Sequence, residues 1–328
     1  MILQRRREQR RHLIAEESQI GEARRDAQRL AMAYGLDETQ TGRVGIAATE
    51  LATNLYRHGS GGEMLLQPVR AGDKESIELL AIDKGRGMSD VGRCLGDGYS
   101  TGGTSGTGLG AVKRMSVEFD IHSVPGEGTV VMSRVGSRAT ARFGAISLAV
   151  EGEIECGDGW ALAEDEEFLT LMVVDGLGHG AFAAAAAECA QEAFAESPED
   201  PPQNFLQRAH RALAGTRRAA AAVAKMSNRG AVSYAGVGNI SGYLVGSEKS
   251  QGLVSHNGTL GLTVPRLQQF EYDRGEDSCL VMHSDGISAR WDLRRNDTLR
   301  QRHPAIIAAV LYRDHGRSRD DATVVVVN

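Results

Sequence analysis

The chain has 328 residues, which predicts about two domains. Its formal net charge of −6 argues against a general nucleic-acid-binding protein, and no run approaches the roughly 18 apolar residues that cross a bilayer, so we expect neither nucleic acid nor membrane as a partner. The four cysteines are dispersed and form no CxxC pair, which predicts reduced thiols in a cytoplasmic protein.

Two helices are predicted near the start of the chain, over residues 19–34 and 40–57, from their apolar spacing. The second helix carries Glu50 and Asn54 one turn apart beside its apolar stripe, so both side chains can reach one point. An amide oxygen can bind Mg²⁺, and a carboxylate can position or deprotonate a hydroxyl. Taken alone, such a Glu/Asn pair is more often a pair of solvent-exposed side chains without a functional role.

A glycine-rich stretch follows an apolar strand predicted over residues 77–82, which ends at Asp83. Seven glycines lie between residues 96 and 110, before a predicted helix. Glycines let the backbone approach a ligand closely, and a helix N-terminus offers unpaired N–H groups to anionic oxygens. The stretch therefore predicts a nucleotide pocket, and the glycines assigned to it are Gly85, Gly87, Gly106, Gly108 and Gly110.

Four motifs in this half occur in the order of one ATP-binding family: TELATN at residues 49–54, DKGRG at 83–87, GTGLG at 106–110 and GT at 128–129. They resemble the N, G1, G2 and G3 boxes of GHKL ATPases, across residues 12–136. The segments at residues 98–102 and 112–119 resemble the small anti-sigma and switch kinases of the stressosome. The resemblance implies a two-layer α/β sandwich of the Bergerat type that binds ATP with Mg²⁺.

The same resemblance implies roles for single residues. Asp83 would bind the adenine amino group, Asn54 would bind Mg²⁺, and Glu50 would be the catalytic carboxylate. Thr129 would line the pocket, and residues 96–110 would form a lid over the phosphates. In these kinases the acceptor is a Ser or Thr hydroxyl on a STAS-domain protein, and a sigma factor is a second candidate partner.

Two other GHKL relatives fit less well. A sensor histidine kinase would carry a phosphoacceptor histidine on a long helical pair upstream, and fewer than 20 residues precede the first predicted helix. A topoisomerase or mismatch-repair ATPase would continue into a transducer domain. Here a short polar joint at residues 136–138 leads into a new apolar alternation at 143–150, so we place the domains at residues 1–137 and 138–328.

The second half has aspartates at the ends of apolar runs. Such residues often meet on one rim of a sheet, where their mutual repulsion favours a hard cation such as Mg²⁺ or Mn²⁺. The alternative is that each one caps a helix or turns a loop. The residues concerned are Asp158, Asp175 with Gly176, Asp285 and Asp320.

These segments resemble the metal motifs of PPM-type phosphatases in the SpoIIE branch, across residues 142–328. The resemblance implies an α-β-β-α sandwich with two Mn²⁺ or Mg²⁺ ions held by the four aspartates and assisted by the Gly176 carbonyl, with Asp175 and Asp285 in catalytic roles. Many members continue the first motif as GDFYD, whereas Gly159 and Trp160 follow Asp158 here. His179 could donate a proton, although we favour a local structural role.

The sequence as a whole predicts an α/β (α+β) protein in which a serine/threonine kinase is fused to a phosphatase that opposes it, both acting on STAS-domain partners. One alternative is an ATP-binding anti-sigma or regulatory module that controls the phosphatase without kinase turnover. Another keeps the kinase and makes the phosphatase half a degenerate scaffold. The oligomeric state, including a homodimer, stays open.

Overall fold

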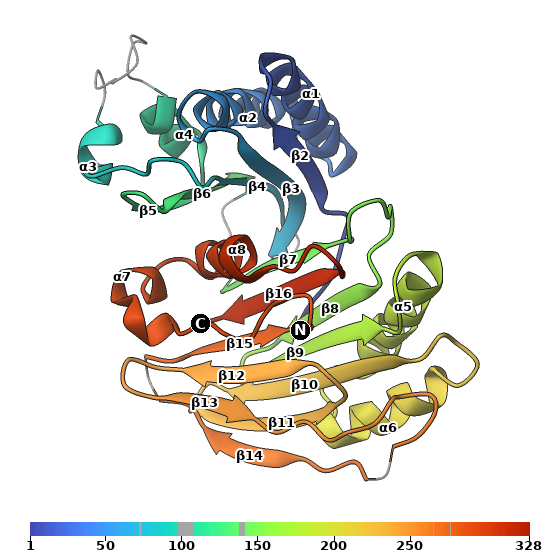
Figure 1. The fold of residues 1–328 in the computed structure, drawn as a ribbon. Helices are drawn as coiled ribbons and strands as arrows, with labels where there is room; N and C mark the ends of the chain where they lie inside the picture. Colours follow the sequence, from blue (N-terminus) through green and yellow to red (C-terminus); the bar gives the residue numbers. More distant parts are fainter. Residues whose placement is uncertain (72–73, 97–107, 138–141, 265, 276) are drawn as a thin grey trace. The chain divides into compact units, whose positions relative to one another are not determined.

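The computed structural model describes the chain except for residues 72–73, 97–107, 138–141, 265 and 276 (Figure 1). It divides into two compact units that exchange short segments. The N-terminal unit comprises Arg7–Ala141 and Ala305–Arg313; the C-terminal unit comprises Met1–Arg6, Arg142–Pro304 and Asp314–Asn328. The sequence predicted a single boundary after residue 137. It did not predict that Met1–Arg6 belongs to the C-terminal unit or that Ala305–Arg313 belongs to the N-terminal unit. Among the described residues, no helix is long and apolar enough to span a membrane.

The N-terminal unit is an antiparallel sheet with helices on one face, in the strand order β2-β3-β4-β6-β5 (Figure 1). The strands are β2 (Arg10–Ile14), β3 (Gly62–Ala71), β4 (Lys74–Ile82), β5 (Glu118–Val124) and β6 (Gly128–Gly136). The helices are α1 (Glu17–Ala33), α2 (Glu38–His58), α3 (Val91–Cys94) and α4 (Gly108–Met115). The predicted helices at residues 19–34 and 40–57 are confirmed as α1 and α2.

Local sequence explains where α1 and α2 begin. Glu16 and Asp37 each form a capping box with the residue three positions later, Gln19 and Gln40 respectively. The apolar stripe of α2, which includes Val44, Leu51 and Leu55, is buried in the core of this unit. Because this stripe is buried, the direction of the neighbouring face of α2, which carries Glu50 and Asn54, is also fixed.

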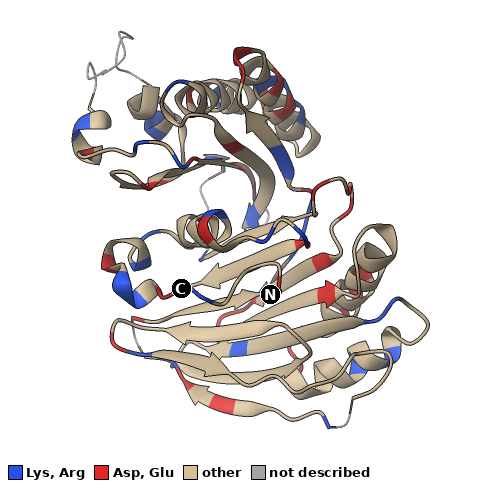
Figure 2. Cartoon of the chain, in the orientation of Figure 1, with Lys and Arg blue, Asp and Glu red and all other residues tan. Residues whose placement is uncertain are grey.

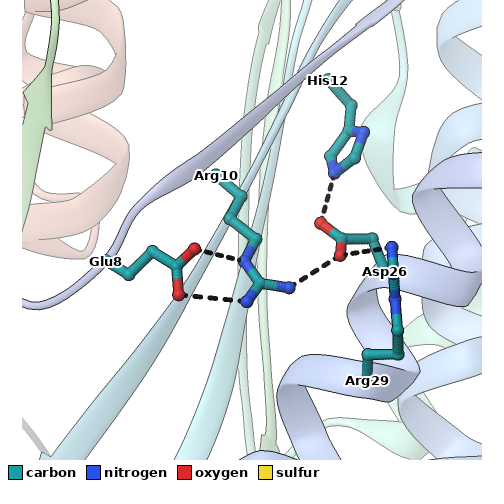
Figure 3. A network of polar contacts seen from close by, with 5 residues as sticks. All are labelled: Glu8, Arg10, His12, Asp26 and Arg29. Carbon is teal, nitrogen blue, oxygen red and sulfur yellow. Dashed lines mark hydrogen bonds and ion pairs between the residues drawn. The ribbon is translucent and has the colours of Figure 1, made fainter. Parts of the chain in front are cut away.

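A carboxylate network joins α1 to β2 (Figure 3). Asp26 of α1 is 7% exposed and accepts from Arg10 Nη1 at 2.7 Å and from Arg29 Nη2 at 3.0 Å, and its Oδ2 lies 2.8 Å from His12 Nε2. Arg10 also donates to Glu8 at 2.8 Å. Since three cationic or imidazole groups surround one buried carboxylate, its burial is compensated. The network attaches the edge strand β2 to the helical layer.

The C-terminal unit contains two antiparallel sheets, in the orders β1-β8-β9-β10-β11-β14 and β13-β12-β15-β16-β7. Most of the length of their strands carries neither acid nor base (Figure 2). The strands are β1 (Ile2–Arg5), β7 (Phe143–Leu148), β8 (Asp158–Glu164), β9 (Phe168–Gly176), β10 (Ala219–Ser227), β11 (Ala231–Val237), β12 (Ser241–Val245), β13 (Ser250–Leu253), β14 (Phe270–Asp273), β15 (Cys279–His283) and β16 (Ala322–Val327).

Helices α5 (Ala181–Glu196) and α6 (Pro202–Ala212) pack on the six-stranded sheet through one apolar core. The alanine run of α5 contributes Ala183, Ala186 and Ala187 to its buried face, and small side chains let the helix lie close to the sheet. A 3₁₀ turn at Leu293–Arg295, α7 (Asp297–Arg300) and α8 (Pro304–His315) lie between β15 and β16 in the chain, and Ala305–Arg313 of α8 belongs to the N-terminal unit. The mixed α/β class predicted for both halves is confirmed.

Candidate functional sites

The first candidate site centres on Asp83, directly after β4. Its Oδ1 accepts backbone hydrogen bonds from Gly85 at 2.8 Å and from Thr129 at 3.1 Å, while its own N–H donates to the Thr129 carbonyl at 2.9 Å. Burial raises the pKa of Asp83, and the two backbone hydrogen bonds oppose that rise. Both hydrogen bonds fall on Oδ1, so Oδ2 carries neither of them.

The glycines around Asp83 are required by close backbone packing. A Cβ on Gly85 would lie 2.7 Å from the His58 carbonyl oxygen. Gly87 has φ +66° and its Cβ would lie 2.1 Å from the Val124 carbonyl oxygen, so no other residue fits. The sequence predicted close approach to a ligand; the approach at these two positions is to the protein's own backbone.

Glu50 and Asn54 of α2 lie beside the start of α4. A Cβ on Gly108, the first residue of α4, would lie 2.9 Å from Glu50 Oε2, so the carboxylate packs against the helix N-terminus. The Asn54 Nδ2 atom is buried and has no hydrogen-bond partner among the described residues. Such a buried amide is a polar group that a ligand can satisfy. The unpartnered N–H groups suit a phosphate oxygen, and the carbonyl oxygen of the same amide is a group that can bind Mg²⁺.

The rest of the predicted lid is only partly described. Gly110 is buried in α4. Gly106 and most of the predicted lid, residues 97–107, lie outside the described residues. The basic residues Lys113 and Arg114 lie in the last turn of α4 rather than at its N-terminus. They therefore do not add positive charge at the helix end that faces Glu50.

The second candidate site begins with two aspartates on adjacent strands. Asp158 of β8 stands opposite Asp175 of β9 in the antiparallel register. Asp158 is 2% exposed, and its Oδ2 accepts a 2.6 Å hydrogen bond from Ser284 Oγ. Burial, followed by the charge of Asp175, raises the pKa of Asp158 well above its ordinary value. Although Gly159 and Trp160 follow Asp158 in place of the usual GDFYD motif, the Asp158 carboxylate lies beside that of Asp175.

Asp285, after β15, joins the same rim through a shared amide. Asn239 Nδ2 donates to Asp175 Oδ2 at 3.0 Å and to Asp285 Oδ2 at 2.8 Å. Burial and the neighbouring charge of Asp285 raise the pKa of Asp175 to about 7. Burial and then Asp285 also raise the pKa of Asp320. Four predicted aspartates therefore meet at one rim of the C-terminal unit.

Asn239 was not predicted as a site residue. Its segment, AGVGNI at residues 235–240, lies in the stretch that resembles the SpoIIE branch, and this resemblance was the available signal. The sequence could not give it a role because its function depends on two carboxylates, Asp175 and Asp285, that are distant along the chain. By donating to both, the Asn239 amide holds the carboxylates in one place.

The two consecutive aspartates before β16 have different surroundings. Asp321 is 2% exposed and accepts from the Val150 N–H at 2.7 Å and the Gly157 N–H at 2.6 Å, so both of its oxygens are engaged with backbone. Asp320 is less buried and is close enough to Asp285 for its pKa to respond. Asp320 is therefore the rim residue, and Asp321 holds the loop that precedes β8.

Gly176 and His179 follow Asp175 in the turn that leads to α5. A Cβ on Gly176 would lie 2.2 Å from the Ala183 carbonyl oxygen, so this glycine allows α5 to approach the end of β9. His179 is 59% exposed on its side chain, and its Nδ1 lies 2.6 Å from Glu153 Oε1. This contact supports the local role expected for His179. Assistance by the Gly176 carbonyl stays a prediction.

The rim fits a hard divalent cation by its chemistry. All its acidic donors are carboxylate oxygens, the ligands that Mg²⁺ and Mn²⁺ prefer. Burial, and after it the charge of Asp285, raises the pKa of Asp175, and a bound cation would offset both effects. Within the described ranges, no three His, Cys, Asp or Glu side chains already enclose a common point. The metal site is therefore supported by the carboxylates that share this rim, and not by a complete set of ligands around one point.

Comparison with known proteins divides the chain in the same way. Residues 13–134 match the family described as histidine kinase-like ATPase domain, and residues 165–328 match stage II sporulation protein E (SpoIIE). The serine/threonine-protein kinase RsbT of Bacillus subtilis (strain 168) is 34% identical over 120 residues, which are 37% of this chain and 90% of RsbT. These matches confirm the resemblance inferred from the motifs.

Two further similarities concern the rest of the chain and its fold. The phosphoserine phosphatase RsbX of Bacillus subtilis (strain 168) is 26% identical over 159 residues, 43% of this chain and 72% of RsbX. A solved structure from work on the bacterial stressosome, a modular system adapted to control secondary messenger signaling, has a TM-score of 0.53 and 32% identity, covering 57% of this chain and 98% of that one. A kinase-like ATPase domain and a phosphatase domain are therefore fused in one chain.

Proposed function

Because this chain belongs to the SpoIIE family and carries a histidine kinase-like ATPase domain ahead of its phosphatase domain, we propose that it both adds and removes a phosphoryl group on one regulatory partner. The kinase half transfers phosphate from ATP to a Ser or Thr hydroxyl, and the phosphatase half hydrolyses the resulting phosphoester. The partner proposed is a STAS-domain protein. The similarity to RsbT and RsbX supports this pairing of opposed activities.

The observation that carries the phosphatase half is the shared amide of Asn239. It holds Asp175 and Asp285 at one rim, where Asp158 and Asp320 add two more carboxylates. These residues would hold two Mn²⁺ or Mg²⁺ ions, which when bound make hydroxide available from water near neutral pH. Asp175 and Asp285 would act by holding the ions, because bound cations and not carboxylates attract the phosphate. No cysteine takes part.

The kinase half is supported by the positions of Glu50, Asn54 and Asp83. Asp83 Oδ2 would accept from the adenine amino group, while the hydrogen bonds to Oδ1 keep the carboxylate fixed. The Asn54 carbonyl oxygen would help to hold Mg²⁺, and its unpartnered Nδ2 would donate to a phosphate oxygen. Glu50, packed against the first residue of α4, would orient the acceptor hydroxyl and accept its proton.

The test is incubation with a STAS-domain candidate in phosphorylated and unphosphorylated form, with ATP and Mn²⁺ varied separately. We expect transfer from labelled ATP to the unphosphorylated partner, lost in Glu50→Ala. We also expect Mn²⁺-dependent release from the phosphorylated partner, lost in Asp175→Asn. ATP binding without transfer would refute kinase turnover and favour a module that binds a partner such as a sigma factor. Release that persists in Asp175→Asn would refute the phosphatase site.

A further inference from the structure

The first six residues of the chain are built into the C-terminal unit. β1 pairs antiparallel with β8 over its whole length, from Ile2 opposite Glu164 to Arg5 opposite Ala161. The pairing continues beyond β1, because the Arg6 N–H donates to the Trp160 carbonyl at 2.8 Å. Leu3 packs against the apolar core under α5 and α6. The segment is therefore a sheet strand of this unit, although about 135 residues of the N-terminal unit separate it from the rest.

The pairing places β1 at the edge of the six-stranded sheet and makes β8 an interior strand. β8 begins with Asp158, a proposed metal ligand. An edge strand has one unpaired row of backbone groups and opens more readily than an interior strand. β1 thus protects the strand that carries this ligand.

Arg6 contacts the backbone around Asp158 directly. Its Nη1 donates to the Cys156 carbonyl at 2.8 Å and to the Asp158 carbonyl at 2.8 Å. The residue between them, Gly157, is held from other sides: its N–H donates to Asp321 Oδ2 at 2.6 Å, and its carbonyl accepts from the Gly176 N–H at 3.0 Å. Arg6 is the one member of this network that comes from ahead of the ATPase domain.

We propose that Arg6 is a positioning residue of the phosphatase, and that the segment Met1–Arg6 is a working part of its metal site. The proposal rests on the phosphatase function proposed above. A charged donor bridging two carbonyls fixes the backbone on both sides of Gly157 and so fixes the direction of the Asp158 carboxylate. Ligand direction determines metal affinity, so Arg6 would act through Asp158.

The experiment uses the full chain with Arg6→Ala and Arg6→Lys, and with Arg5→Ala as the matched control, because Arg5 is an exposed neighbour on the same strand. Mn²⁺ binding is measured by calorimetry, and hydrolysis of p-nitrophenyl phosphate is titrated with Mn²⁺. Unfolding in EDTA is followed separately. We expect Arg6→Ala to weaken Mn²⁺ binding at least fivefold with an unchanged KM for the phosphate ester. A lysine ammonium can donate to one of the two carbonyls with good geometry, so the Mn²⁺ affinity of Arg6→Lys should lie between those of the wild type and Arg6→Ala.

The outcomes separate the two proposals. Suppose that the wild type binds Mn²⁺ and that Arg6→Ala binds it as tightly as Arg5→Ala does. This result would overturn the proposed role of Arg6 and leave the phosphatase proposal standing. So would a variant that unfolds at lower temperature but keeps its Mn²⁺ affinity, because that is the mark of a purely structural residue. A wild-type chain without Mn²⁺ binding or ester hydrolysis would overturn the phosphatase proposal as well.

Discussion

Replacing Asp175 by asparagine is expected to stabilise the metal-free C-terminal unit while abolishing metal binding. Burial and the charge of Asp285 raise the pKa of Asp175 to about 7 from the ordinary 3.8, so keeping it ionised above pH 7 costs the folded state about 4 kcal/mol. Asparagine removes the charge and keeps an oxygen for the Asn239 amide. Since it also buries a polar amide, we expect a net gain of about 1–3 kcal/mol.

The gain should depend on pH in one direction. A carboxyl whose pKa is raised by folding destabilises the folded state progressively between its unfolded and folded pKa values, so the gain from Asp175→Asn is full above about pH 7 and absent below about pH 4. With Mn²⁺ at 100 times its Kd, the wild type gains about 2.7 kcal/mol and the variant gains none.

Tryptophan fluorescence can follow this unit by itself, because both tryptophans of the chain, Trp160 and Trp291, lie in it. Denaturant titrations in EDTA at pH 4 and pH 8 give the two free energies of unfolding. Asp277→Asn, which removes one exposed charge from the same unit, should change them by less than about 0.5 kcal/mol. A variant of Asp175 less stable than the wild type at pH 8, or equally stabilised at pH 4, would refute the electrostatic reasoning.

Three further outcomes are expected in the N-terminal unit. Glu50→Gln should keep ATP binding, measured by calorimetry, and lower transfer from labelled ATP about 100-fold or more; undiminished transfer would contradict its role as a base. Gly128→Ala should destabilise the unit by about 2–4 kcal/mol in calorimetric unfolding, because Gly128 has φ +102° and its Cβ would lie 2.2 Å from a backbone oxygen. Gly126→Ala is the matched control, with φ +84° and nothing within 4 Å, and should cost only about 1 kcal/mol; equal losses would exclude the steric account. Arg134→Met should cost about 3–5 kcal/mol because it leaves the fully buried Glu78 without the guanidinium 2.7 Å away, and a loss below 1 kcal/mol would argue against that pairing.

The features that could be predicted from the amino-acid sequence are those that depend on residues close together in the chain. Apolar spacing predicted α1 and α2, although not the capping boxes at their first residues, and apolar runs predicted the strands before Asp83 and Asp175. Helix and strand periods are local properties, so they can be read without knowing the partner of each element. The order of the motifs also determined the two families, because each motif is a short contiguous segment.

Features that depend on strand register and on contacts between distant segments became known from the folded structure. It gave Asp321 its two backbone contacts, brought in Asn239, and assigned β1 to the C-terminal unit. None of these follows from periodicity, because a strand carries no local signal of which strand it will pair with. A side chain's role at a shared rim is set by the groups that folding brings to it, and those can lie far away along the chain, as with Val150 and Asp321, which are 171 residues apart.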